Sequence, residues 1–128
     1  MTLTFNELNA MNDCITELKE QKLPFKISLI LAKNSSILSK EMEFYIEQER
    51  QFAQKFLAVD ENGQFIQEGD GVYRINEGME EECRAARLAL NDFTCDVELR
   101  KLPMSALENL EFTPKQLSAL EMIIDEEA

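Results

Sequence analysis

The stretch LPFKISLILAKNSSILSKEMEFYIEQERQFAQKFLAV, residues 23–59, decides the fold of this chain. It predicts one long amphipathic helix, because a proline suits the first helical turn and no further glycine or proline occurs before Gly63. An apolar side chain recurs every seven residues, at Leu31, Leu38, Tyr45, Phe52 and Val59. Such a helix would extend roughly 50 Å, and its apolar stripe needs a surface to cover it.

A shorter amphipathic helix is predicted before it, over about Phe5–Glu20. Thr4 and Glu7 match the capping-box pattern that starts a helix. The short link to the long helix predicts an antiparallel helical hairpin. Because the first helix can cover only about half of the second, the segment 44–56 needs another cover. We expect either the C-terminal half of the chain or a second copy of the protein to supply it.

The C-terminal half is predicted to be a mixed lobe. Asp60–Gly63 is expected to end the long helix, and the runs 64–67 and 72–75 to form a hairpin in which Gly69 and Gly71 adopt positive φ. Asn76 is expected to cap a helix over 77–91. A strand over 94–102 would then complete a three-stranded antiparallel sheet, followed by a helical turn at 105–110 and a helix that begins at Thr113-Pro114-Lys115-Gln116. The predicted fold is therefore α+β, a single domain over 1–128 with a hairpin (1–59) and a lobe (60–128) that packs on the long helix.

The composition disfavours several classes of partner. With 25 acidic and 13 basic residues the net charge is −12, which disfavours direct binding to nucleic acid or to an anionic membrane and favours a basic protein partner. No apolar run is long enough to span a membrane, and the acidic start MTLTFNELNAMND is unlike a signal peptide. Cys14, Cys83 and Cys95 are expected to be reduced thiols of an intracellular protein.

Catalytic chemistry finds little support. The chain has no histidine, the commonest general base and metal ligand, and three scattered cysteines do not form a zinc site. Asp96 and Glu98 resemble part of a nuclease site, but strand alternation would place Lys101 on the opposite face. We therefore expect no enzyme, no cofactor and no metal, and an enzyme using carboxylates and magnesium is the third alternative. Glu41, Glu43, Glu47 and Glu49 are expected to form a solvated helix face, and the segment from Asp60 departs from a calcium-binding loop.

Acidic residues concentrate in two segments, with eight acids and one base over 60–82 and six acids and one base over 102–128. If these segments lie side by side, they form one acidic lobe that could dock a basic partner or mimic nucleic acid. The candidate interaction surface consists of Tyr45, Phe52, Phe56, Glu77, Glu80, Glu81, Asp125 and Glu126.

Nearly the whole chain resembles a family of small uncharacterised proteins from tailed phages and prophages of Gram-positive bacteria. The resemblance rests on Lys22–Lys26, Ala32–Asn34, Glu47–Arg50, Asp60–Gly63, Asp96–Leu99 and Leu117–Ile123. It implies a phage origin and the cytoplasm of a bacterial host, and it carries over no catalytic residue.

Two functions follow as expectations. The first is a non-enzymatic phage accessory protein that acts through protein–protein contacts, in assembly or in modulating a host process, with itself as one partner in a homodimer. The alternative is an acidic, DNA-mimic-like inhibitor of a nucleic-acid-binding host or defence protein.

Overall fold

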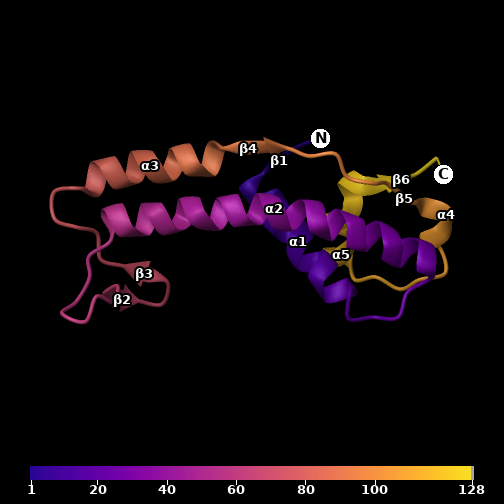
Figure 1. Ribbon diagram of the computed structural model, residues 1–128, viewed down its shortest axis with the longest axis horizontal. Coiled ribbons are helices and arrows are strands. Elements are labelled where there is room, and N and C mark those ends of the chain that lie inside the picture. Colours follow the sequence, from indigo (N-terminus) through magenta and orange to yellow (C-terminus); the bar gives the residue numbers. More distant parts are fainter. Residues whose placement is uncertain (128) are drawn as a thin grey trace. The chain divides into compact units, whose positions relative to one another are not determined.

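The computed structural model describes residues 1–127 and confirms the α+β class, with a long helix after a short one (Figure 1). The helices are α1 (Phe5–Leu18), α2 (Phe25–Phe56), α3 (Glu80–Asp92), α4 (Met104–Leu107), α5 (Pro114–Leu120) and the 3-10 turn η1 (Glu121–Ile123). The strands are β1 (Thr2–Thr4), β2 (Gln67–Gly69), β3 (Val72–Tyr73), β4 (Thr94–Asp96), β5 (Leu102–Pro103) and β6 (Ile124–Asp125).

The chain divides into two compact units, and α2 contributes to both. Unit 1 comprises Met1–Glu43 and Thr94–Ala128, and unit 2 comprises Phe44–Phe93. The predicted organisation as a single domain of hairpin and lobe stays a prediction.

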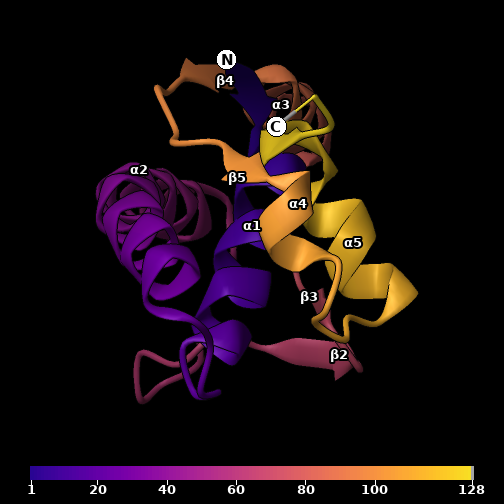
Figure 2. The ribbon, with the colours of Figure 1, turned by 90° about the vertical axis from the view of Figure 1, so that its right-hand side faces the viewer.

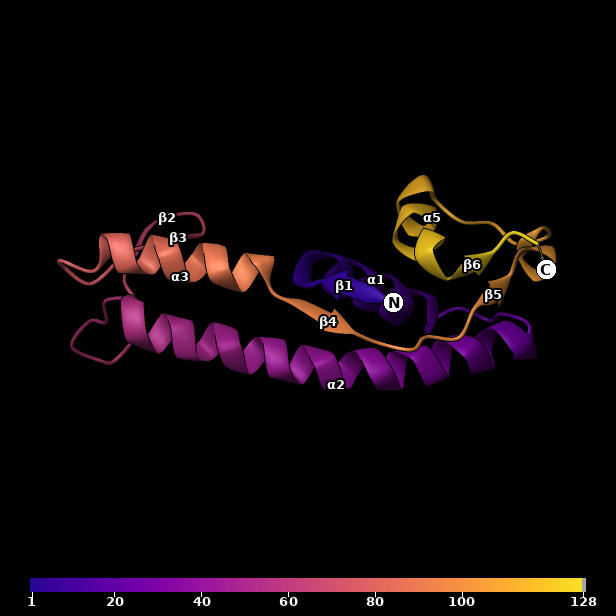
Figure 3. The same cartoon turned by 90° about the horizontal axis from the view of Figure 1, so that it is seen from above.

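Helix α1 begins where its local chemistry predicts. The Thr4 hydroxyl accepts a hydrogen bond from the Glu7 N–H at 3.2 Å, and the Glu7 carboxylate accepts one from the Thr4 N–H at 3.0 Å, so the capping box is complete. Leu8, Met11 and Ile15 are at most 1% exposed on its inner face. Figures 1 and 3 show α1 and the first half of α2 running in opposite directions within unit 1, as expected for a helical hairpin.

Helix α2 is continuous, and its ends lie within a few residues of those predicted. Pro24 immediately precedes the helix, and its carbonyl accepts the first hydrogen bond, from the Ser28 N–H at 3.0 Å. The helix stops at Phe56, because Leu57 pairs with Ile75 as an isolated β-bridge. Its stripe is buried in unit 1, where the exposed fractions are Ile27 1%, Leu31 2% and Leu38 0%.

The predicted three-stranded sheet is wrong, because the segment 94–102 pairs elsewhere. Strand β4 is antiparallel to β1, with Leu3 opposite Cys95, while β2 and β3 form a separate hairpin and β5 is parallel to β6. The Thr2 hydroxyl also donates a hydrogen bond to the Asp96 carboxylate at 2.6 Å, and the Val97 N–H donates one to the Met1 carbonyl at 2.9 Å. The N-terminal residues thus supply the partner strand, which the sequence analysis missed.

The start of α3 also differs from the prediction. The residue at its N-cap is Met79 rather than Asn76, and it forms no side-chain capping hydrogen bond. Gly78 has φ of +85°, a backbone conformation that interrupts any helix running from residue 77. The Asn76 side chain instead donates a hydrogen bond to the Lys55 carbonyl at 3.5 Å.

The C-terminal helices follow the prediction closely. Helix α4 overlaps the expected turn at 105–110 and begins one residue before it, and Pro114 is the first residue of α5. The Thr113 hydroxyl accepts a hydrogen bond from the Gln116 N–H at 3.1 Å, and the Gln116 side-chain oxygen accepts one from the Thr113 N–H at 2.9 Å. Gln116 is 6% exposed, and its amide nitrogen also donates to the Glu17 carboxylate at 3.0 Å, which ties α5 to α1.

Unit 2 contains a small ring of backbone hydrogen bonds. The Ala58 N–H donates to the Arg74 carbonyl at 2.9 Å, the Arg74 N–H to the Ile66 carbonyl at 2.9 Å, and the Ile66 N–H to the Ala58 carbonyl at 3.1 Å. Three segments around these residues are therefore held to one another. Of the two glycines predicted to adopt positive φ here, Gly71 does so at +72°, whereas Gly69 does not, because the turn needs only one such residue.

Candidate interaction surfaces

The aromatic stripe predicted as an interaction surface is covered from within unit 2 by α3, which lies alongside the end of α2 (Figure 3). Phe56 is 3% exposed, and its ring centroid is 5.1 Å from that of Phe52. Tyr45 and Phe52 are partly exposed, and the exposed Phe44 has its ring centroid 5.8 Å from that of Phe93. The C-terminal half of the chain therefore supplies much of the missing cover.

Arg87 of α3 holds this contact together. Its guanidinium donates two hydrogen bonds to the Glu49 carboxylate, at 2.6 and 3.0 Å, and its Cζ lies 4.1 Å from the ring centroid of Phe52. The hydrogen bond from Arg87 lowers the pKa of Glu49, although partial burial opposes this. Burial and the hydrogen bond to Glu49 raise the pKa of Tyr45.

The predicted acidic residues fall in different units. Glu77, Glu80 and Glu81 are exposed in unit 2, the last two in the first turn of α3, where negative charge suits the helix dipole. Asp125 is partly buried in β6 of unit 1 and accepts a hydrogen bond from the Glu127 N–H at 3.1 Å, and Glu126 beside it is exposed. Their union in one acidic lobe stays a prediction.

The hairpin of unit 2 carries an exposed apolar patch that was not predicted from the sequence. Val59 pairs with Phe65 across an antiparallel bridge, and the Phe65 ring meets that of Tyr73 edge-on with centroids 6.4 Å apart. Their exposed fractions are 53%, 39% and 41%. We call these three residues the hairpin patch. The spacing of Phe65 and Tyr73 in the two runs was visible in the sequence, but the bridge that adds Val59 was not.

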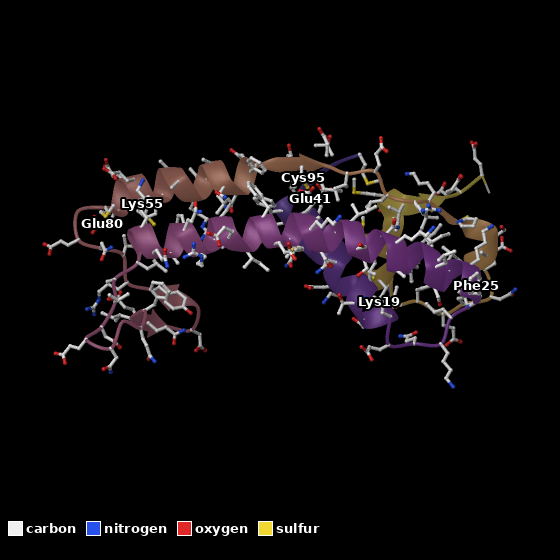
Figure 4. The ribbon with its side chains drawn as sticks, viewed as in Figure 1. Lys19, Phe25, Glu41, Lys55, Glu80 and Cys95 are labelled. Atoms are coloured by element: carbon white, nitrogen blue, oxygen red, sulfur yellow. The ribbon has the colours of Figure 1, made fainter. Side chains whose placement is uncertain are left out.

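Carboxylates and thiols also occur elsewhere in the described part of the chain. No group of three or more Cys, Asp or Glu side chains within residues 1–127 is arranged to hold a metal ion. The three cysteines form no disulfide, and burial together with Glu41 and Asp96 raises the pKa of Cys95, which stands beside Glu41 in unit 1 (Figure 4). Glu47 pairs with Arg50 on the α2 surface, which lowers the pKa of Glu47 to about 2.

Fold and surfaces together define a small α+β protein with exposed apolar patches on both units. Compared with family models, with curated proteins and with solved structures, the chain matches none of them. Among the described residues, no helix is long and apolar enough to cross a membrane.

Proposed function

We propose that this chain is a non-enzymatic phage accessory protein that acts in the cytoplasm of its bacterial host through protein–protein contacts. The phage origin rests on the family resemblance given above. The mode of action rests on unit 2, where few apolar side chains are buried and many large ones stay exposed.

The balance between buried and exposed apolar residues in unit 2 carries the proposal. Within this fully described unit, only Phe56 and Cys83 are buried apolar residues. Large apolar side chains that stay exposed there are Phe44, Ile46, Val59, Phe65, Val72, Tyr73, Leu88 and Phe93. A unit of this size is marginal without more cover, and contiguous exposed apolar surface is typical of a binding site. The hairpin patch joins three of these residues through contacts with one another, whereas Phe44 and Phe93 form a separate pair, so we assign the hairpin patch as the partner-binding surface.

The test replaces apolar atoms of the hairpin patch without disturbing its backbone. Threonine keeps the β-preference of both sites, so the double variant Val59→Thr, Tyr73→Thr should fold like the wild type and lose partner binding. Met122→Gln is the matched control, because Met122 is 37% exposed in unit 1 and lies outside the hairpin patch. Each protein is used to capture partners from host lysate, with folding checked by circular dichroism. Equal capture by the double variant and the control would contradict the assignment.

A second function is favoured by the acidic surface of unit 2. Glu77, Glu80 and Glu81 are exposed and form no ion pair with any residue in the described range 1–127. With a net charge of −12, such a surface supports an inhibitor that occupies the nucleic-acid site of a basic host or defence protein. Captured partner should then be released by salt and by duplex DNA, and weakened by Glu80→Gln, Glu81→Gln. A partner that DNA does not displace would exclude this alternative.

A further inference from the structure

Unit 1 carries an apolar groove that its own core leaves open. Met104 of α4, Leu117 of α5 and Ile124 of β6 line two adjoining hollows of about 570 and 250 Å³. Met104 and Leu117 are each 42% exposed. In the view of Figure 2, α4 and α5, which both contribute residues to the larger hollow, lie on the same side of α1. The groove thus presents apolar atoms to solvent in a concave surface, the shape in which an apolar side chain of a partner is best desolvated.

The rim of the groove is acidic and has no internal counter-charge. Glu108 and Glu111 line the larger hollow, and Glu121 and Glu126 line the smaller one. None of the four forms an ion pair with another residue of the described chain, and no lysine or arginine lines either hollow. An occupant that suits this groove therefore has an apolar tip flanked by positive charge.

The same unit carries a segment with that chemistry. Phe25, the first residue of α2, is 80% exposed and is labelled at that end of the helix in Figure 4, and Leu29 one turn later is 41% exposed. Lys22 and Lys26 flank the phenyl ring in the sequence, are exposed, and form no ion pair with described residues. We call Lys22, Phe25, Lys26 and Leu29 the basic knob.

We propose that the basic knob of one copy enters the acid-rimmed groove of a second copy, giving a homodimer. Figures 1 and 3 both place α4 and the beginning of α2 at the same end of unit 1. Two copies related by a two-fold axis at that end can therefore exchange contacts, each giving its knob and receiving the other's. The phenyl ring and Leu29 cover the floor of the groove, and the two lysines meet the glutamates of the rim. The inference rests on the proposal that the chain acts through protein contacts, but it uses a surface separate from the hairpin patch.

Sedimentation velocity of the full chain over a range of concentrations tests the dimer. The wild type should dimerise, and both Phe25→Gln and Leu117→Gln should weaken dimerisation by about tenfold or more, because each removes an apolar contact from the centre of the interface. Both side chains are exposed in the single copy, so their replacement leaves the fold intact. Leu88→Gln is the matched control, because Leu88 is 58% exposed on a helix of unit 2. The proposal would be overturned if the wild type stays monomeric at about 1 mM. It would also be overturned if the control Leu88→Gln weakens dimerisation as much as the two test variants do.

Charge reversal tests the pairing of knob with groove. The variants Lys22→Glu, Lys26→Glu and Glu108→Lys, Glu111→Lys should each fail to dimerise alone, because like charges then face each other. Mixed in equal amounts they should form a heterodimer, since each of its two contacts joins opposite charges. Absence of that heterodimer, or growth of the wild type beyond two copies, would refute the reciprocal contact. The double variant Val59→Thr, Tyr73→Thr should dimerise like the wild type. If the homodimer is not found, the proposed partner-binding surface is therefore unaffected and is tested separately by capture from host lysate.

Discussion

Asn34 offers the sharpest test of how unit 1 is held together. This residue occupies a core position of α2, between Leu31 and Leu38 on the buried stripe, and is 0% exposed. Its amide nitrogen donates a hydrogen bond to the Arg100 carbonyl at 3.0 Å, and its side-chain oxygen accepts one from the Arg100 N–H at 2.8 Å. One side chain thus satisfies both backbone groups of a residue in the link between β4 and β5.

Replacing Asn34 by alanine should destabilise unit 1 by about 2 to 3 kcal/mol. Each lost hydrogen bond contributes about 1 kcal/mol, and a backbone group left without a partner adds to the cost. Both hydrogen bonds are only partly buried, so the upper end of the range for buried groups does not apply. Asn34→Asp should destabilise at least as much, because it keeps an acceptor for the Arg100 N–H but turns a second carboxylate oxygen toward the Arg100 carbonyl and buries a charge.

Urea unfolding followed by circular dichroism measures the free-energy change, and hydrogen exchange of the Arg100 amide reports the contact itself. Ser36→Ala, an exposed site on the same helix, is the control and should change little. In Asn34→Ala the Arg100 amide should exchange faster than in the wild type. A loss of stability under about 0.5 kcal/mol, the size expected for a neutral surface change, together with unchanged protection of that amide, would refute the reasoning.

Two further changes test contacts elsewhere in the chain. Because Arg87 holds the pKa of Glu49 below its usual 4.5, the stability that Glu49 contributes is present above about pH 4.5 and is lost as pH falls through the lowered folded-state pKa. Glu49→Gln should therefore be less stable than the wild type at pH 7, and the difference should shrink as the pH falls below 4.5, as followed by tyrosine fluorescence, since Tyr45 and Tyr73 both lie in unit 2. Thr113→Ala removes the hydroxyl that caps α5 and should cost about 1 kcal/mol in thermal unfolding, whereas Thr113→Ser should keep most of it; equal loss in both variants would argue against the cap.

Features that depend on neighbouring residues were predictable from the sequence. The capping patterns at Thr4 and Thr113 act over a single helical turn, so the residue types alone locate both helix starts. The length of α2 followed from an unbroken run without glycine or proline. The pairing of β1 with β4 was not predictable, because it joins residues at opposite ends of the chain and three-residue strands carry almost no pattern of their own.

The candidate interaction surfaces were likewise predictable only in part. The periodicity of α2 showed which side chains share a face, but it could not show that Arg87 would cover Phe52. Nor could it show that Val59, counted as the last residue of the stripe, would leave the helix and join the hairpin patch. Periodicity identifies a face that must be covered, and only tertiary contacts identify the cover.

The single stripe of α2 therefore serves two units with different kinds of cover. In unit 1 it is aliphatic, and residues such as Leu31 and Leu38 are almost fully buried. In unit 2 it is aromatic, and an arginine covers Phe52 while leaving it partly exposed. Because fewer apolar atoms are buried in unit 2, its own contacts contribute less to the free energy of unfolding. Unit 2 should therefore open more readily than unit 1, and a bound partner should stabilise it more. A partner bound at the hairpin patch would then stabilise the less stable of the two units. The small number of buried apolar residues in unit 2 is therefore explained by its proposed function in binding.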